Sequence, residues 1–336
     1  MNTLAPIVLF VYNRPTHTQQ VVEALQNSIL ASESELYIFS DAPKDEVNIP
    51  NVREVRKYIK TISGFKNITI QESNHNKGLA NSIIDGVTQI IDKYGKVIVL
   101  EDDLITNQWF LTFMNEALNK YENQNEIYMI GGHNVKLKVP FWYTNDYYLT
   151  HRSCSWGWGT WRNRWIKADW GMKEYNNFIN NESEINRFNR IGSDATPMLK
   201  AQMEGKIDSW AIRWEFCMFK HDAYCLRPIH SLITNIGLDG TGVHCGKTDS
   251  SAITYKTYDN ESYDIQLPSK AQKCKTLEEN FKKFQDRNKI ARDKELRKKR
   301  RAHIIMILTH PRYIAGWLKR KVQTLFKKRQ GKNISI

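Results

Sequence analysis

Apolar runs and amphipathic stretches alternate through the first 125 residues of the chain. The short continuous apolar runs are typical of strands buried on both faces, and the stretches between them repeat apolar residues at helical spacing. The pattern predicts strands over residues 6–12, 36–40, 68–70 and 97–100 and helices over 16–27, 52–62, 80–93 and 109–121. This order predicts an α/β fold with a doubly wound sheet flanked by helices.

Beyond residue 125 the alternation fades, although residues 127–130 could continue the sheet. Five of the ten tryptophans lie between Trp156 and Trp170, with glycines among them. Rings separated by glycine can form flat walls that stack on a sugar face. Large aromatic side chains are also mostly buried, so the same rings could form a rigid core behind a site. The sequence leaves both interpretations open.

Three carboxylates, Glu101, Asp102 and Asp103, directly follow the fourth predicted strand. The carboxyl ends of strands are where open α/β sheets bind ligands, and adjacent carboxylates repel one another unless a cation offsets their charge. Mg²⁺ or Mn²⁺, shared with nucleotide phosphates, would suit such oxygen ligands. The alternatives are a solvated acidic turn, or a helix start in which Asp102 or Asp103 caps the helix over 109–121.

Two later stretches carry further candidates. Asp208 precedes an apolar helix over 210–219, where it could serve as its N-cap. Glu215 on that helix could be a surface acid or pair with Arg213 or Lys220. Residues 235–244 form a glycine-rich loop that ends in His244. A histidine in such a loop is either an ordinary surface residue or a ligand.

Composition narrows the protein class. The chain has 336 residues with 41% hydrophobic content, enough for one large or two fused globular units. Five scattered cysteines without a CxxC pair disfavour a disulfide framework or a zinc knuckle. Neither GxGxxG nor GxxxxGK[ST] occurs, which disfavours dinucleotide and P-loop chemistry. Without a signal peptide or an apolar run of spanning length, we expect a cytoplasmic protein.

The positive charge belongs to one end of the chain. Residues 287–336 contain 17 Lys and Arg against two acids, a charge of +15, whereas residues 1–286 carry 32 − 34 = −2. Short apolar patches alternate with the cationic clusters, a pattern suited to the interface of an anionic membrane. We therefore expect peripheral attachment to the inner face of the cell membrane through this tail. The alternative is a solvated or disordered basic extension.

The order of several short motifs resembles bacterial glycosyltransferase family 2-like sugar transferases of GT-A fold and, more distantly, the N-acetylglucosaminyltransferase I family. The resemblance covers about residues 5–250. The motifs that carry it are residues 7–14, Ser40-Asp41, Asn76-Lys-Gly-Leu79, Val99-Leu-Glu-Asp-Asp-Leu104, Ser155-Trp-Gly-Trp158, Asp208-Ser-Trp210 and Gly240-Thr-Gly-Val-His244. The resemblance implies a GT-A-type mixed sheet, a nucleotide-sugar donor that is usually UDP-linked, a divalent cation and an inverting transfer.

The same resemblance implies roles for individual residues. Asp103 would ligate Mn²⁺ or Mg²⁺, and His244 would complete the metal site from a loop that closes over the donor. Asp208 would be the catalytic base, with Glu215 in reserve because the eukaryotic relatives carry a second acid where this chain has Ser209. Residues expected to contact the nucleotide-sugar are Arg14, Asp41, Lys77, Glu101, Asp102, Trp156 and Trp158.

These inferences combine into one prediction of organisation and activity. Residues 1–125 would form the nucleotide-sugar-binding half, 126–270 the acceptor-binding and catalytic half, and 271–336 a basic amphipathic helical tail. The enzyme would transfer a sugar to a hydroxyl of a glycan or lipid-linked glycan in polysaccharide, capsule or lipopolysaccharide assembly. A sugar nucleotidyltransferase is disfavoured because no glycine follows the first strand. A nucleic-acid-binding role for the tail is the remaining alternative, and no nucleic acid partner is expected.

Overall fold

The computed structural model describes residues 3–239 and 257–309. The chain divides into two compact units, residues 1–284 and residues 285–336.

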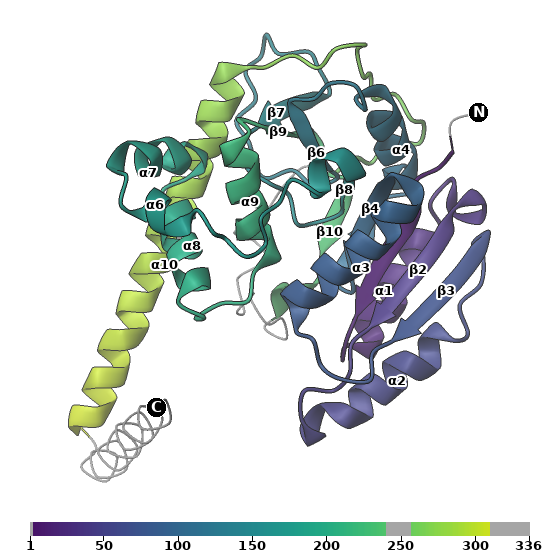
Figure 1. The fold of residues 1–336 in the computed structure, drawn as a ribbon, viewed down its shortest axis with the longest axis horizontal. Coiled ribbons are helices and arrows are strands. Elements are labelled where there is room, and N and C mark those ends of the chain that lie inside the picture. The colour runs from purple at the N-terminus through teal and green to yellow at the C-terminus, as the bar shows by residue number, and fades with distance from the viewer. Residues whose placement is uncertain (1–2, 240–256, 310–336) are drawn as a thin grey trace. The chain divides into compact units, whose positions relative to one another are not determined.

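The first unit begins with the strand–helix alternation that the sequence predicts (Figure 1). Its first seven main elements are β1 (Ile7–Val11), α1 (Pro15–Gln26), β2 (Glu35–Ser40), α2 (Ile49–Ile59), β3 (Asn67–Glu72), α3 (Leu79–Tyr94) and β4 (Lys96–Glu101). Short 3-10 turns, η1 (Ala31–Glu33) and η2 (Glu46–Asn48), precede β2 and α2. Every predicted strand and helix of this part is present, with ends that differ by a few residues.

The remaining elements are shorter and less regular. They are β5 (Leu104–Thr106), α4 (Phe110–Lys120), β6 (Ile127–Gly131), β7 (Tyr147–Thr150), β8 (Trp158–Trp161), α5 (Arg162–Trp165), α6 (Tyr175–Ile179), α7 (Glu182–Phe188), η3 (Asn189–Ile191), α8 (Ala195–Met203), α9 (Trp210–Lys220), β9 (Tyr224–Pro228), β10 (Ile233–Asn235), η4 (Gly237–Asp239) and α10 (Lys275–Thr309).

Eight strands form one mixed sheet in the order β3-β2-β1-β4-β8-β6-β9-β7, and β10 pairs with β5 in a separate two-stranded sheet. Four of the seven pairings in the large sheet are parallel: β2–β3, β1–β2, β1–β4 and β6–β9. The predicted α/β class, a mixed sheet flanked by helices, is confirmed.

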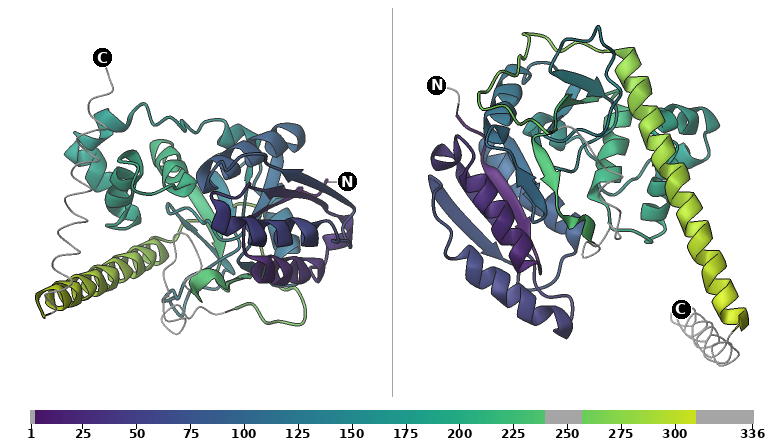
Figure 2. Two further views of the ribbon diagram at one scale, coloured as in Figure 1. Left: turned by 90° about the horizontal axis from the view of Figure 1, so that it is seen from below. Right: turned by 180° about the vertical axis from the view of Figure 1, so that it is seen from behind.

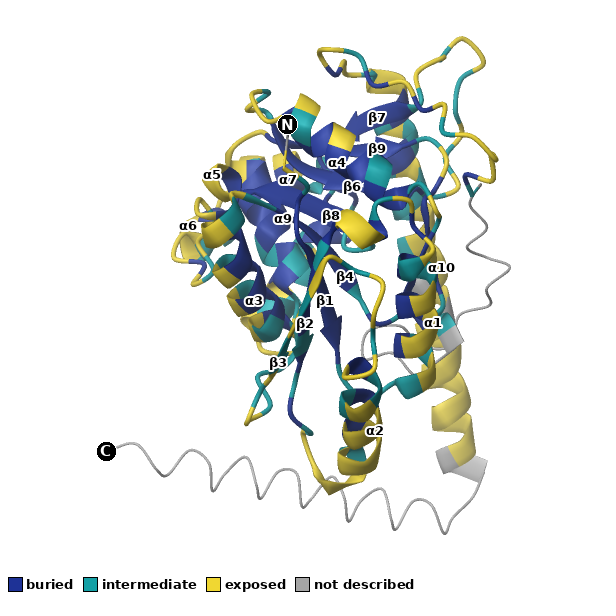
Figure 3. Ribbon diagram, turned by 90° about the vertical axis from the view of Figure 1, so that its right-hand side faces the viewer, coloured by how far each residue is buried: buried dark blue, intermediate teal, exposed yellow. Residues whose placement is uncertain are grey.

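Strand β1 shows why helices cover both faces of the sheet. Side chains alternate along a strand, so Ile7 and Leu9 pack with α1, α2 and α4, whereas Val8 and Phe10 pack with α3 and α9. All of these strand residues are buried. The views from below and from behind show α1 and α2 on one side of β1–β3 and α3 on the other (Figure 2). The outward helix faces are exposed (Figure 3).

The tryptophan-rich segment lies mainly inside the protein. Trp158, Trp161 and Trp165 are fully buried on β8 and α5, and the Trp158 ring stacks on Trp210 of α9 with centroids 4.6 Å apart. Strand β8 is antiparallel to β4, so these rings lie beside the strand that ends in the three carboxylates. The core interpretation therefore applies to these three tryptophans.

Two capping interpretations are wrong. The helix over residues 110–120 begins after Trp109, and β5 separates it from Asp102 and Asp103, so neither acid caps it. Ser209, rather than Asp208, is the N-cap of α9, where its hydroxyl accepts a hydrogen bond from the amide of Ile212 at 3.4 Å. All three acids are therefore available for other roles.

Helix α10 begins in the first unit, where Leu277 and Phe281 are buried beside Tyr148. In the second unit, the described residues 285–309 continue as helix, with exposed apolar side chains at Ile290, Leu296, Ile304 and Ile305. Among the described residues, no helix combines the length and the apolarity needed to cross a bilayer.

Candidate functional site

The carboxyl ends of three neighbouring strands bring the first candidate residues to one edge of the sheet. Strand β1 pairs in parallel with both β2 and β4. Arg14 follows β1, Asp41 follows β2, and Asp102 and Asp103 follow β4. Residues separated by about 90 positions in the sequence therefore meet at the edge where open α/β sheets bind ligands.

Arg14 bridges the two aspartates. Its Nη2 atom forms an ion pair with Oδ1 of Asp102 and lies 3.1 Å from Oδ2 of Asp103. The amide of Tyr12 donates to the second oxygen of Asp102 at 3.3 Å. The side chain of Asp102 is 6% exposed and that of Asp103 is 15% exposed. Asp102 thus anchors Arg14 from within, and Asp103 lies closer to solvent.

Negative charge is crowded at the end of β4. Burial, followed by the charges of Asp103 and Asp102, raises the pKa of Glu101 to about 8. Burial also raises the pKa of Asp103, although Arg14 opposes that shift. For Arg14 itself, burial alone would lower the pKa, but the two aspartates raise it above its ordinary value. One guanidinium therefore offsets only part of the charge of three acids.

The start of the glycine-rich segment lies against Asp103. The amide of Ile236 donates to the backbone carbonyl of Asp103 at 2.9 Å, and β10 pairs antiparallel with β5, which follows Asp103. The predicted metal ligand His244 lies outside the described residues. Within the described ranges, no group of three or more His, Cys, Asp or Glu side chains is arranged to hold a metal ion.

Asp41 organises the loop between β3 and α3. Its carboxylate accepts hydrogen bonds from the amides of Lys77 at 3.0 Å and Gly78 at 3.1 Å, and from the side-chain amide of Asn76 at 3.1 Å. The ammonium of Lys77 forms an ion pair with Asp85 at 2.9 Å. Asp41 and Lys77, two of the seven residues that the motif resemblance assigns to the nucleotide-sugar, therefore have structural contacts that shape this loop.

Asp208 lies at the other end of the same loop. Its Oδ2 atom accepts a hydrogen bond from the amide of Ala80, in the first turn of α3, at 3.1 Å. Gly78 precedes that turn with φ +78°, a conformation that favours glycine, and a Cβ on Gly78 would lie 3.0 Å from Oδ2 of Asp208. Asp208 is exposed. The loop over residues 76–78 thus lies between two candidate carboxylates.

Glu215 belongs to a buried network on α9. Its side chain is 3% exposed and accepts from Arg152 Nε at 2.9 Å, from the amide of Ser153 at 3.1 Å and from the hydroxyl of Ser153 at 2.9 Å. Arg152 also pairs with Asp194 at 3.0 Å. Burial raises the pKa of Glu215, and Arg152 opposes that shift. These contacts connect α9 to the segment before β8.

The two candidate tryptophans differ in exposure. Trp156 is half-buried, and its ring lies 4.4 Å from that of the buried His133. Trp158 is fully buried between other tryptophans, so its ring supports the site from the core. Only Trp156 has surface available for a ligand.

The sequence did not indicate two arginines that hold backbone segments around the site together. Arg56 of α2 donates to the backbone carbonyls of Ser73 at 2.7 Å and Ser40 at 3.4 Å, which joins the ends of β3 and β2. Arg227 of β9 is buried and donates to the carbonyls of His133 and Ser153. No local pattern marks either arginine, because their partners are backbone groups distant in the sequence.

Comparisons with known proteins give a limited likeness. No protein-family model and no curated protein matches the chain. Among solved structures, a mannosyltransferase, PcManGT from Pyrobaculum calidifontis in complex with GDP-Man and Mn²⁺, is 12% identical with a TM-score of 0.36, covering 49% of this chain and 47% of its own. TarS 1–349 of S. aureus is 13% identical with a TM-score of 0.32, covering 49% of each chain. Its complex with UDP-GlcNAc is also 13% identical, with a TM-score of 0.27, covering 41% of this chain and 36% of its own. The chain thus matches less than half the length of these neighbours.

Proposed function

We propose that this protein is an inverting glycosyltransferase that moves a sugar from a nucleoside-diphosphate sugar, a UDP-sugar in view of the motif resemblance, to a hydroxyl of a glycan or lipid-linked glycan. The observation that carries the proposal is the Arg14–Asp102–Asp103 cluster at the carboxyl ends of β1 and β4. The guanidinium of Arg14 is suited to the phosphates of a nucleotide. The carboxylates beside it, with Glu101 nearby, are suited to an accompanying metal ion.

Arg14 and the neighbouring acids would have different roles in donor binding. Nη1 of Arg14 is buried and has no hydrogen-bond partner among the described residues, so it is a donor that a bound phosphate oxygen could satisfy after a small movement. Asp102 holds the guanidinium in place, and Asp103 is the more exposed acid. Asp41 would act through the loop at residues 76–78, whose backbone amides it orients.

The crowding of Glu101, Asp102 and Asp103 beside a single arginine supports a divalent cation there, because carboxylate oxygens are the ligands that such ions prefer. Asp103 would hold Mn²⁺ or Mg²⁺, and His244 is the second proposed ligand. When bound, the ion would neutralise charge that develops on the leaving diphosphate.

Asp208 is the proposed catalytic base. A base must reach the acceptor hydroxyl, take its proton and leave the oxygen free to attack the anomeric carbon from the side opposite the diphosphate. Asp208 is exposed, whereas Glu215 is buried and bonded to Arg152 and Ser153, so access favours Asp208. Because direct displacement inverts the anomeric centre, an α-linked donor would give a β-glycoside.

The half-buried Trp156 is the proposed sugar-stacking residue, whereas Trp158 is buried in the core. An acceptor linked to lipid would be concentrated at a membrane, where the exposed apolar and basic side chains of residues 285–306 could bind anionic head groups. We therefore propose a peripheral location at the inner face of the membrane.

A panel of nucleotide-sugars tests the proposal. The protein is incubated with each donor and Mn²⁺, and slow release of free nucleoside diphosphate is measured with wild type and with Asp103→Asn. Release from one donor class by wild type alone supports glycosyl transfer. Formation of a nucleotide-sugar from sugar phosphate and nucleoside triphosphate would instead identify a nucleotidyltransferase. Absence of both reactions, with binding to nucleic acid that weakens steeply with salt, would reject the proposal.

A further inference from the structure

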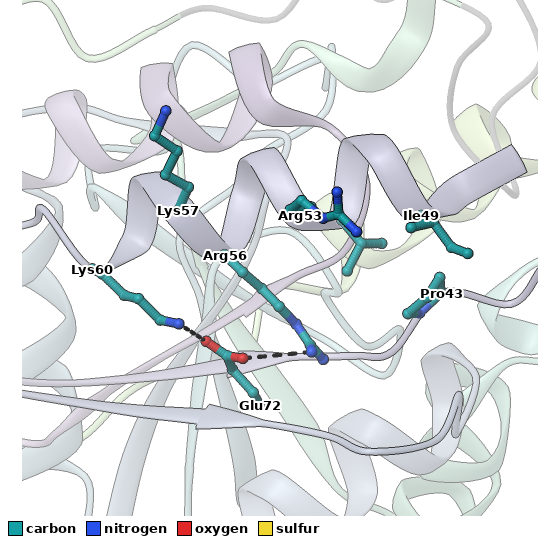
Figure 4. Close-up of a pocket in the computed structure, with 8 residues that line it drawn as sticks. Pro43, Ile49, Arg53, Arg56, Lys57, Lys60 and Glu72 are labelled. Carbon is teal, nitrogen blue, oxygen red and sulfur yellow. Dashed lines mark ion pairs between the residues drawn. The ribbon is translucent and has the colours of Figure 1, made fainter. Parts of the chain in front are cut away.

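A basic groove lies along α2, apart from the residues proposed for catalysis. It has a volume of about 530 Å³ and is formed by α2, the segment that precedes it, and the end of β3 (Figure 4). Four cations line it, and they recur at positions i, i+3, i+4 and i+7 of the helix: Arg53, Arg56, Lys57 and Lys60. This spacing places all four on one face of α2.

The groove has more positive charge than its acid can neutralise. Glu72 is its single acidic lining residue, which leaves 4 − 1 = +3. Glu72 lies 2.8 Å from the ammonium of Lys60 and 3.5 Å from Arg56. In Figure 4, Arg56 and Lys60 reach toward Glu72, whereas Lys57 points away from it. Glu72 thus forms ion pairs with only two of the four lining cations, Arg56 and Lys60.

Arg53 and Lys57 have no ion-pair partner among the described residues, and both are exposed. They are four positions apart, so they are neighbours on the helix surface, where like charges repel. An anion between them would relieve that repulsion. Arg56 is already fixed by the carbonyls at the ends of β2 and β3, so it adds a rigid positive charge to the groove.

The groove also has an apolar side. Pro43, Ile49 and Val52 line it, and Ile49 remains 39% exposed. A concave site of a few hundred Å³ that combines apolar residues with a few charged groups is typical of small-ligand sites. A flat layer of lipid head groups would match such a concave surface less well than a small soluble molecule would.

We propose that this groove binds a soluble phosphate-bearing ligand, with its phosphate oxygens between Arg53 and Lys57 and an apolar part against Ile49 and Pro43. Arginine and lysine form charge-assisted hydrogen bonds with phosphate, and the two free cations offer them without breaking the pairs to Glu72. The inference does not depend on the proposed transferase activity, because none of these residues belongs to the proposed donor site.

The test uses inorganic pyrophosphate as the probe, titrated calorimetrically into the full-length protein at low salt. EDTA is present, so that metal-assisted binding near Asp103 does not contribute. The variant is Arg53→Gln with Lys57→Gln. The control is Lys173→Gln with Lys200→Gln, which removes the same charge from two exposed lysines outside the groove.

We expect the groove variant to bind pyrophosphate roughly tenfold more weakly or worse, since charge-assisted bonds are lost, while the control binds like wild type. Equal binding by the groove variant and wild type, or equal weakening in the control, would overturn the proposal. The proposal would also be overturned if the groove variant bound pyrophosphate like wild type but no longer sedimented with phosphatidylglycerol vesicles. That result would assign the groove to membrane binding. Thermal melts of both double variants establish that they are folded.

Discussion

Gly237 lies against Asp103 so closely that no side chain fits between them. A Cβ built on Gly237 would lie 2.2 Å from Oδ2 of Asp103 and 2.9 Å from its Cβ. Real Cβ atoms essentially never lie under 3.0 Å from such atoms, so Asp103, which follows β4, keeps its position only because residue 237 is glycine. Two segments separated by more than 130 residues therefore determine where this carboxylate lies.

The first prediction tests this contact. Gly237→Ala should displace the carboxylate of Asp103 and reduce nucleoside diphosphate release at least tenfold, because the acid would no longer be positioned for the cation. The change lies beside a side chain near the surface, so we expect a small effect on the thermal melt. Gly205→Ala is the control for the loss of a glycine, since its Cβ would meet nothing within 4 Å, although its φ of +66° adds some strain. Full activity of Gly237→Ala would show that Asp103 need not stay where it is.

The second prediction separates the two aspartates. Asp102→Asn should lower the free energy of unfolding by about 1.5–3 kcal/mol, because a buried charge-assisted bond to Arg14 is lost. Asp103→Asn should affect stability less and activity more, because Asp103 is more exposed, whereas Asp102 also accepts the amide of Tyr12. Denaturant unfolding of the metal-free protein and donor turnover measure the two effects. A fully active Asp103→Asn variant would reject the metal assignment.

The third prediction concerns the base. Asp208→Asn should reduce turnover by about 10²–10⁴-fold while UDP affinity stays near wild type, because a base acts on the acceptor hydroxyl. Ser209→Ala is the matched control: it removes the cap of α9 and should cost about 1 kcal/mol of stability without comparable loss of turnover. Normal turnover by the Asp208→Asn variant would mean that Asp208 acts structurally, through its hydrogen bond with the Ala80 amide at the start of α3.

The fourth prediction concerns the buried network. Glu215→Leu should lower the free energy of unfolding by about 3–5 kcal/mol, because Arg152 would remain buried with one carboxylate fewer. Glu182→Leu, an exposed residue at the start of α7, is the control and should change stability little. If Glu215→Gln unfolds like wild type but loses all turnover, Glu215 would replace Asp208 as the proposed base.

The fifth prediction concerns the basic tail. A protein ending at Phe284 retains Leu277 and Phe281, which are buried in the first unit, and should keep its donor hydrolysis in solution. It should no longer sediment with anionic vesicles at low salt, because the exposed apolar residues within 290–306 and the basic clusters of residues 285–336 are gone. Equal sedimentation of the truncated and full-length proteins would reject membrane attachment through this segment.

The sequence by itself determined the α/β class and the main strands and helices of the first 125 residues, but not the short strand β5. Local signals carry this information: β1 and β4 are continuous apolar runs, and α3 repeats buried residues at helical spacing before Gly95. The same signals located Arg14, Asp41, Asp102 and Asp103 at the ends of strands. Because parallel strands end at one edge, the sequence also indicated that these residues meet.

Only the tertiary structure decided what each of these side chains contacts. Asp208 lies against the first turn of α3, and Glu215 is buried with Arg152, although the two acids are seven residues apart in the sequence. The space for Asp103 depends on Gly237, and the ends of β2 and β3 are joined by Arg56. Local propensity determines which secondary structure one segment forms. These contacts depend instead on how segments distant in the sequence pack against one another, and no single stretch of sequence contains that information.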